Sequence, residues 1–177
     1  MELVDIFNDD NKVVAIGHDR WEKLNANEHQ KFVFLCLFNK KGQLLIQKRN
    51  KLKKMFPGMW DLSVGGAVQS GESSFEAIQR ETKEEAGIEL ITKFKKPFIT
   101  LYLENFICDY YVLQSDIGID DLKMQIEEID EFKFVSLEEI KTMIDKGDFM
   151  PYHLSFLNFI FETYKTPYTR LNHKDWV

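Results

Sequence analysis

Three carboxylates stand close together along the chain, at Glu81, Glu84 and Glu85. At 100° per residue a helix places Glu84 and Glu85 on either side of Glu81, about 60° and 40° away, so all three share one face. Partly shielded carboxylates at this spacing repel one another by about 2 to 3 kcal/mol for each pair. A divalent cation removes that cost, and an incomplete set of oxygen ligands is typical of Mg²⁺ or Mn²⁺.

An isolated cluster of this kind is more often a solvated glutamate face, so the flanking residues decide between the two interpretations. Gly66 is followed by five residues, Glu72, seven residues and then the run from Arg80 to Ile88. The spacing matches GX5EX7REUXEEXGU, the Nudix box, at every fixed position, with Thr82 where U asks for an aliphatic residue. The chain therefore resembles the Nudix family.

The resemblance implies an α/β fold, namely an α/β/α sandwich around a mixed sheet. It implies an enzyme that hydrolyses a nucleoside diphosphate linked to another moiety, with Mg²⁺ or Mn²⁺ as cofactor. Glu84 and Glu85 would be metal ligands, and Glu81 a further ligand or the base that deprotonates water. The backbone carbonyl of Gly65 or Gly66 would complete the metal shell.

Two further roles follow from the resemblance. Glu72 and Arg80 would form a structural ion pair that ties the box loop to its helix. An acidic residue from the loop before a later strand would add a metal ligand, and Glu128 has the matching placement, with Glu127 as the alternative. A solvated loop glutamate is an equally good interpretation of Glu128.

A basic segment lies just before the box, because residues 40–54 hold seven basic side chains and no acidic one. Arg49 or Lys48 could contact substrate phosphates, and the other lysines are expected on a solvated turn and edge. Trp60 and Phe56 could stack on a base, although packing beneath the box loop is the favoured interpretation.

The segments LLIQKR and FPGMWDLSVGG also resemble the branch of the superfamily that contains isopentenyl diphosphate isomerase. The isomerase carries a catalytic Cys and a metal-binding His in the stretch aligned with residues 61–68, where this chain has Gly65 and Ala67. We therefore expect an isomerase-like hydrolase and not an isomerase. A catalytically silent module that senses a nucleotide is a third hypothesis, which the complete set of box glutamates disfavours. Which nucleoside diphosphate derivative is the substrate stays open.

The expected elements place these residues between strands and one amphipathic helix. Ser73 and Glu76 form a capping box that starts a helix ending at Ala86, and Gly87 stops it. Residues 55–71 read as a loop with a short extended piece at 60–64. The other expected elements are a hairpin around residues 8–11, a second hairpin of FVFLCLF and QLLIQKR, strands FITLYL, FICDYYVL and FKFVSL, and helices 137–145 and 152–164.

Length and composition fit a single domain over residues 1–177, with a hairpin extension at 1–30, the box at 66–88 and a flexible tail at 167–177. The net charge of −6 disfavours binding to a nucleic-acid polymer, and the longest apolar run is too short to span a membrane. The acidic start lacks the pattern of a signal peptide. The apolar surroundings of Cys36 and Cys108 in the sequence predict buried reduced thiols. We therefore expect a cytoplasmic protein. The hairpin extension and the terminal helix could form a homodimer surface.

Overall fold

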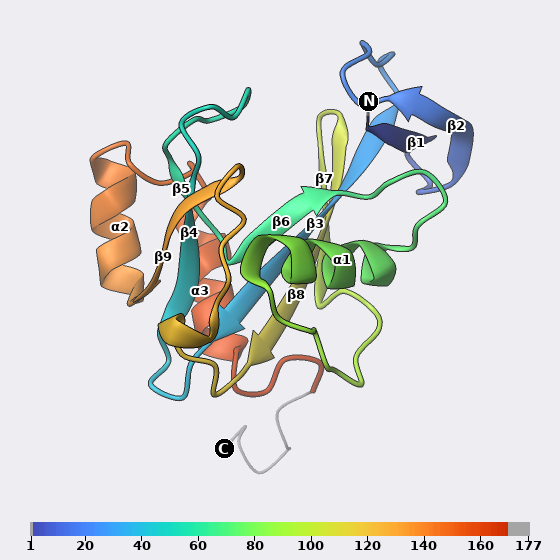
Figure 1. The fold of residues 1–177 in the computed structure, drawn as a ribbon. Helices are drawn as coiled ribbons and strands as arrows, with labels where there is room; N and C mark the ends of the chain where they lie inside the picture. The colour runs from blue at the N-terminus through green and yellow to red at the C-terminus, as the bar shows by residue number, and fades with distance from the viewer. Residues whose placement is uncertain (1, 170–177) are drawn as a thin grey trace.

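The computed structural model describes residues 2–169 (Figure 1). Within them nine strands form one mixed sheet, with helices on both faces. The strands are β1 (Leu3–Phe7), β2 (Val13–Asp19), β3 (His29–Phe38), β4 (Leu44–Arg49), β5 (Trp60–Asp61), β6 (Val64–Ala67), β7 (Ile99–Leu103), β8 (Phe106–Gln114) and β9 (Ile129–Val135). The helices are α1 (Ser74–Ala86), α2 (Leu137–Asp145) and α3 (Leu154–Thr163), with a 3-10 turn at Ile119–Asp121.

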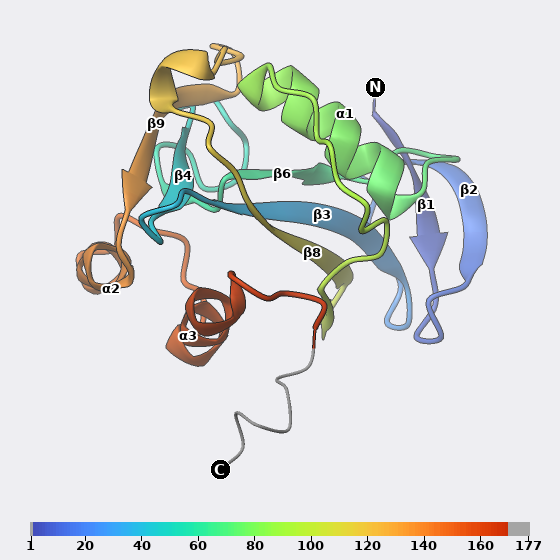
Figure 2. The same cartoon turned by 90° about the horizontal axis from the view of Figure 1, so that it is seen from below.

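The sheet lies between two helical layers, which confirms the expected α/β/α sandwich. Figure 2 shows α1 on one face and α2 with α3 on the other. Strand β3 contributes side chains to the hydrophobic cores on both faces of the sheet, because side chains alternate between the faces of a strand. Val33 and Leu35 pack in the core beneath α1, whereas Cys36 and Phe38 pack in the core beneath α3.

Strand β3 is the centre of the sheet. It pairs in parallel with β8 from Gln30 to Phe38 and antiparallel with β6. The predicted β3–β4 hairpin is present at its turn, but the two strands pair only at Phe38 and Leu44 and then diverge. Strand β4 pairs instead with β5 and β9. The sheet is therefore split into two halves that separate away from the turn.

Helix α1 begins and ends as predicted. The Ser73 hydroxyl accepts from the backbone N–H of Glu76, and the Glu76 carboxylate accepts from the Ser73 backbone N–H. Gly87 ends the helix with φ of 70°, a left-handed conformation that glycine adopts without strain. Thr82 is fully buried, and its hydroxyl donates to the Ile78 carbonyl at 2.6 Å, which satisfies the polar group that replaces an aliphatic residue.

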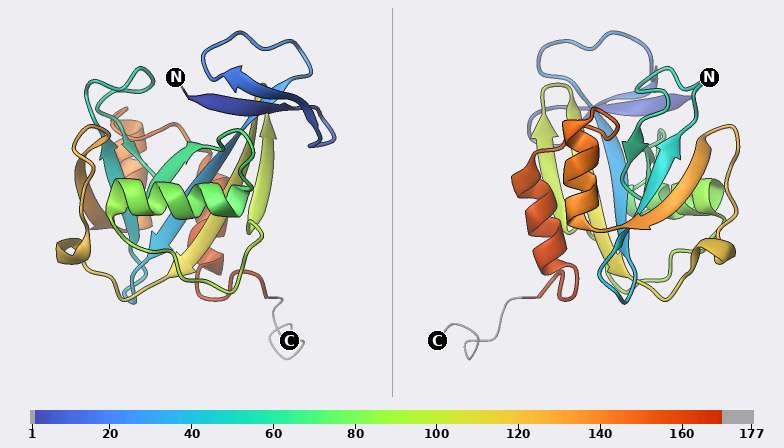
Figure 3. Two further views of the ribbon diagram at one scale, coloured as in Figure 1. Left: turned by 45° about the vertical axis from the view of Figure 1, so that its right-hand side comes forward. Right: turned by 90° about the vertical axis from the view of Figure 1, so that its left-hand side faces the viewer.

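The other predictions hold with shifted bounds. Helix α2 has its predicted range, α3 is shorter than predicted, and the extended piece at 60–64 divides into β5 and β6. Figure 3 shows the β1–β2 hairpin at one end of the sheet. Most of the predicted tail, residues 170–177, lies outside the described residues. In residues 2–169 no helix has the length and apolar character needed to cross a bilayer.

Candidate active site

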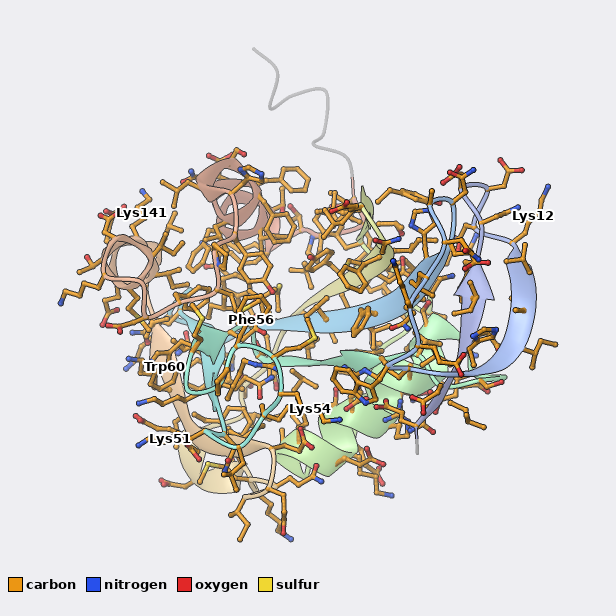
Figure 4. All side chains as sticks on the ribbon, turned by 90° about the horizontal axis from the view of Figure 1, so that it is seen from above. Lys12, Lys51, Lys54, Phe56, Trp60 and Lys141 are labelled. Carbon is orange, nitrogen blue, oxygen red and sulfur yellow. The ribbon has the colours of Figure 1, made fainter. Side chains whose placement is uncertain are left out.

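A pocket of about 870 Å³ lies where the two halves of the sheet diverge. Its lining residues come from α1, β6, β3, β8, the loop after β4 and the segment before α3. Figure 4 views this end of the molecule from above, with Lys51, Lys54 and Phe56 on the loop after β4. All three predicted glutamates of α1, Glu81, Glu84 and Glu85, line the pocket.

The two glycines of β6 have no side chains, so neighbouring side chains can lie directly against this strand. A Cβ on Gly66 would overlap the Glu81 carboxylate, so only glycine at this position leaves room for that group. The Gly65 N–H donates to Glu85 Oε2 at 3.1 Å, and a Cβ on Gly65 would lie 2.6 Å from the Phe34 ring. Gly66 thus admits a carboxylate and Gly65 admits an aromatic ring.

Burial changes the acidity of two glutamates on α1. Glu81 is 9% exposed and Glu85 is 5% exposed. Burial raises the pKa of Glu85 to about 8, and the nearby Glu81 carboxylate adds to this rise. Burial also raises the pKa of Glu81, against the opposing effect of the Arg80 guanidinium. Both groups are therefore costly to ionise unless a cation comes close.

Arg80 joins the loop before α1 to the helix through its ion pair with Glu72. Its Nε donates to Glu72 Oε1 at 2.8 Å and its Nη2 donates to Glu72 Oε2 at 3.0 Å. Its Nη1 lies 2.7 Å from Glu81 Oε1 and 3.2 Å from Glu84 Oε2. The guanidinium thus neutralises the cluster from one side.

Glu128 also lines the pocket, whereas Glu127 is not among the lining residues. The Glu128 carboxylate forms an ion pair with Lys53, whose ammonium extends from the loop after β4. The Lys53 charge also acts on Glu81 and Glu85, and burial lowers the pKa of Lys53. A second cation, on the loop after β4, therefore acts on the carboxylates.

The predicted substrate contacts divide into two groups. Arg49 and Phe56 line the pocket. Lys48 and Trp60 do not: Trp60 is 7% exposed in the core beneath α3, with the Lys133 and Lys48 ammonium groups 4.0 and 5.7 Å from its ring centroid. The structure therefore does not support Lys48 and Trp60 as substrate contacts, because neither lines the pocket and the Trp60 side chain packs in the core beneath α3.

A scan of family profiles matches the NUDIX domain to residues 28–154, which is most of the chain. An uncharacterised Nudix hydrolase of Listeria innocua is 38% identical over 162 residues, covering 92% of this chain and 95% of the relative. The chain belongs to the Nudix family. Since its relatives are Nudix hydrolases, it is a hydrolase that acts on pyrophosphate bonds.

Further matches agree in sequence and in fold. A Nudix hydrolase of Deinococcus radiodurans is 37% identical over 125 residues, covering 65% of this chain and 69% of the relative. A crystal structure of a D. radiodurans protein superposes with a TM-score of 0.73 at 28% identity, covering 95% of this chain and all of that one. A MutT protein of Methanosarcina mazei gives a TM-score of 0.58 at 25% identity, covering 80% and 96%.

The box residues of this Nudix chain fit a hard divalent cation. The donors are carboxylate oxygens and strand carbonyls. Because Gly66 has no side chain, the Glu81 carboxylate lies against the backbone of β6. Within residues 2–169, no three acidic, imidazole or thiol side chains are already gathered as a metal site. Instead Arg80 and Lys53 neutralise the carboxylates, so a bound cation would take over part of their role.

Sequence reasoning missed the pocket residues farther from α1. Asp61, Phe34, Tyr110 and Tyr152 all line the pocket. Asp61 is 3% exposed, and burial raises its pKa although a hydrogen bond from Tyr152 acts in the opposite direction. The alternation of Phe32 and Phe34 within FVFLCLF was the only local signal, and it predicts a strand without indicating a pocket wall.

Proposed function

We propose that this Nudix hydrolase cleaves a diphosphate linkage in a nucleoside diphosphate attached to another moiety, and that it needs Mg²⁺ or Mn²⁺. The observation that carries this proposal is that Glu81 and Glu85 reach the glycines of β6, while Glu84 lines the same pocket. The volume of about 870 Å³ is in the range of small-molecule sites and has room for a nucleotide derivative.

The proposed ligands are Glu84, Glu85, Glu81 and a carbonyl of Gly65 or Gly66, with Glu128 as a further carboxylate. When bound, the cation neutralises the diphosphate oxygens and acidifies a water molecule. Glu81 is also a candidate for the base that accepts the proton, because its raised pKa brings it nearer to neutral pH.

Basic side chains in the pocket are the proposed phosphate contacts. Arg49 is held in place, since its Nε and Nη2 donate to the Met55 carbonyl at 3.1 and 3.0 Å. Its Nη1 stays directed toward Asp61 and the pocket. Lys53 supplies a second positive charge at the same wall. An anionic substrate would replace Glu128 as the partner of Lys53.

Several finer proposals accompany this function. We place the chain in the isomerase-like branch because of its segments LLIQKR and FPGMWDLSVGG, and as a hydrolase because Gly65 and Ala67 give β6 neither a thiol nor an imidazole. The two free, buried cysteines Cys36 and Cys108 support a cytoplasmic location. Exposed apolar residues on the β2 strand support a homodimer.

An assay of nucleoside diphosphate derivatives with Mg²⁺, Mn²⁺ or EDTA tests the proposal. We expect metal-dependent release of phosphate or a nucleoside monophosphate, and its loss in Glu84→Gln. The matched control is Glu89→Gln, since Glu89 is an exposed glutamate just beyond α1. Tight nucleotide binding with no turnover under either metal would favour the sensing module instead, and conversion of isopentenyl diphosphate without hydrolysis would favour the isomerase.

A further inference from the structure

A buried carboxylate lies in the pocket apart from the glutamates of α1. Asp61 on β5 is 3% exposed and lines the pocket. Its Oδ1 accepts from the Tyr152 hydroxyl at 2.7 Å and from the Leu62 N–H at 2.8 Å. Its Oδ2 lies 3.6 Å from Arg49 Nη1, which is an ion pair longer than a hydrogen bond. Among residues 2–169, none donates a hydrogen bond to Oδ2.

Oδ2 is the oxygen of this carboxylate that stays free to accept a hydrogen bond, because its charged neighbour Arg49 lies beyond hydrogen-bond distance. The Asp61 side chain lines the pocket, so a ligand there can supply the donor. Anchoring Tyr152 accounts for Oδ1 alone, and an asparagine oxygen would serve that purpose equally well. The open oxygen therefore points to a donor that arrives with the ligand.

Aromatic rings beside Asp61 define the shape of that ligand. Phe34 and Tyr110, both pocket residues, stack with their ring centroids 5.1 Å apart and their planes 17° apart. Phe156 connects them to Tyr152, with centroid distances of 4.7 Å to Tyr110 and 5.8 Å to Tyr152. Rings in this arrangement form an apolar wall that suits a flat ring with a polar edge.

Gly65 connects this wall to the proposed metal end of the pocket. Its N–H is bonded to Glu85, while its missing Cβ leaves room for the Phe34 ring. A ligand whose phosphates lie at α1 can therefore place its ring against Phe34 and the edge of that ring toward Asp61.

We propose that Asp61 determines base specificity by accepting a hydrogen bond from the amino group of a nucleobase. The proposal rests on the nucleoside diphosphate substrate proposed above. In its ionised form, as the partner of Arg49, the Asp61 carboxylate accepts and cannot donate, so it favours an amino group and repels a carbonyl oxygen. Cytosine and adenine are therefore preferred to uracil and hypoxanthine, in which a carbonyl replaces that amino group.

Equilibrium binding in EDTA tests the proposal without any turnover. Wild-type protein is titrated with CDP and UDP, and with ADP and IDP, in a calorimeter. We expect the amino member of each pair to bind about tenfold more tightly, which corresponds to about 1.4 kcal/mol. Equal affinities within both pairs, or tighter binding of UDP and IDP, would overturn the proposal without the need for a variant.

The variant Asp61→Asn then assigns the preference to one side chain. Its amide oxygen can keep the bonds from Tyr152 and Leu62, while its NH₂ replaces the open oxygen by a donor. We expect the ratio of affinities within each pair to fall to one or to invert, and an unchanged ratio overturns the assignment. The control Tyr152→Phe removes the hydroxyl from Oδ1 and leaves Oδ2 in place, so the preference should persist.

The two proposals fail in different ways. Base preference in EDTA with no hydrolysis under any metal would refute the proposed function alone. Metal-dependent hydrolysis with no base preference would refute the role of Asp61 alone. A purely structural role of Asp61 predicts that Asp61→Asn lowers binding of all four nucleotides equally, which would also refute specificity.

Discussion

The Glu81 carboxylate lies directly against Gly66, in the space that a β-carbon at position 66 would fill. In Gly66→Ala the carboxylate must move away from β6. Displacement of a catalytic group by about 1 Å costs on the order of 100-fold in rate. We expect kcat for diphosphate hydrolysis with Mg²⁺ to fall by about that factor, while circular dichroism shows a folded protein.

The control for this prediction is Gly118→Ala. Gly118 has an ordinary φ of −92°, and a β-carbon there would lie 3.6 Å from Asp121 Oδ2, a normal contact. Its kcat should equal that of the wild type. If Gly66→Ala also keeps the wild-type kcat, then the position of Glu81 is unimportant for catalysis.

Arg80 should contribute to stability as well as to the site. Replacement by Ala removes both hydrogen bonds to Glu72 and leaves Glu81 and Glu84 without a neighbouring guanidinium. Hydrogen bonds to charged groups contribute about 1.5 to 3 kcal/mol each, so we expect the free energy of unfolding to fall by about 2 kcal/mol or more. Urea denaturation in EDTA measures it.

Lys83→Ala is the matched control for Arg80→Ala, because Lys83 is an exposed cation on the same helix. It should change the free energy of unfolding by less than about 0.5 kcal/mol. Arg80→Lys should remain destabilised, since an ammonium cannot form the two parallel bonds to Glu72. Equal stability of Arg80→Lys and the wild type would show that the paired geometry contributes nothing.

Local signals were enough to predict α1 and its bounds. The capping box, the apolar stripe and the terminal Gly87 lie within a few residues of one another, and each acts on the helix itself. The box glutamates could be assigned to one face for the same reason. Trp60 and Lys48 could not be placed, because the face that a short strand presents depends on its partners in the sheet.

Pairing between strands that are far apart in the sequence explains the features of the fold and the pocket that could not be predicted. Strand β6 is half glycine and has little strand propensity, and it forms because β3 pairs with it across about thirty residues. Strand β4 leaves β3 after Phe38, and residues 32–35 of β3 pair with β6 instead. Asp61 therefore reaches the pocket through contacts between distant segments, and its neighbours in sequence gave no signal of this.

The acidity of Glu85 links stability, pH and metal binding. Its pKa rises from 4.5 to about 8 on folding, so between these values the folded carboxyl is protonated while the unfolded one is ionised. The contribution of Glu85 to stability is therefore full at low pH and is lost as pH rises toward 8. In EDTA we expect wild-type stability to fall with pH relative to Glu85→Gln, as measured by thermal melts from pH 5 to pH 8.

Divalent metal binding at pH 7 should release the proton of Glu85, because only the ionised carboxylate is a ligand. Mg²⁺ titrations in buffers of different ionisation enthalpy measure the number of protons released. We expect about one proton more for the wild type than for Glu85→Gln. Identical proton release in the two proteins, or identical pH profiles of stability, would contradict a raised pKa at this position.

Lys53 should compete with the metal for the carboxylates. Its ammonium pairs with Glu128 and also acts on Glu81 and Glu85. In Lys53→Met that positive charge is lost, so we expect Mn²⁺ to bind about fivefold more tightly in the absence of substrate, equivalent to about 1 kcal/mol. KM should rise, because the same charge is a proposed phosphate contact. Electron paramagnetic resonance of free Mn²⁺ measures the affinity.

Lys51→Met provides the control for Lys53→Met, since Lys51 is an exposed lysine on the same loop and does not line the pocket. Its Mn²⁺ affinity and its KM should match those of the wild type. Weaker Mn²⁺ binding in Lys53→Met would show that Lys53 organises the carboxylates for the metal. An unchanged affinity would show that the ion pair with Glu128 forms outside the metal site, and would remove Glu128 from the proposed ligands.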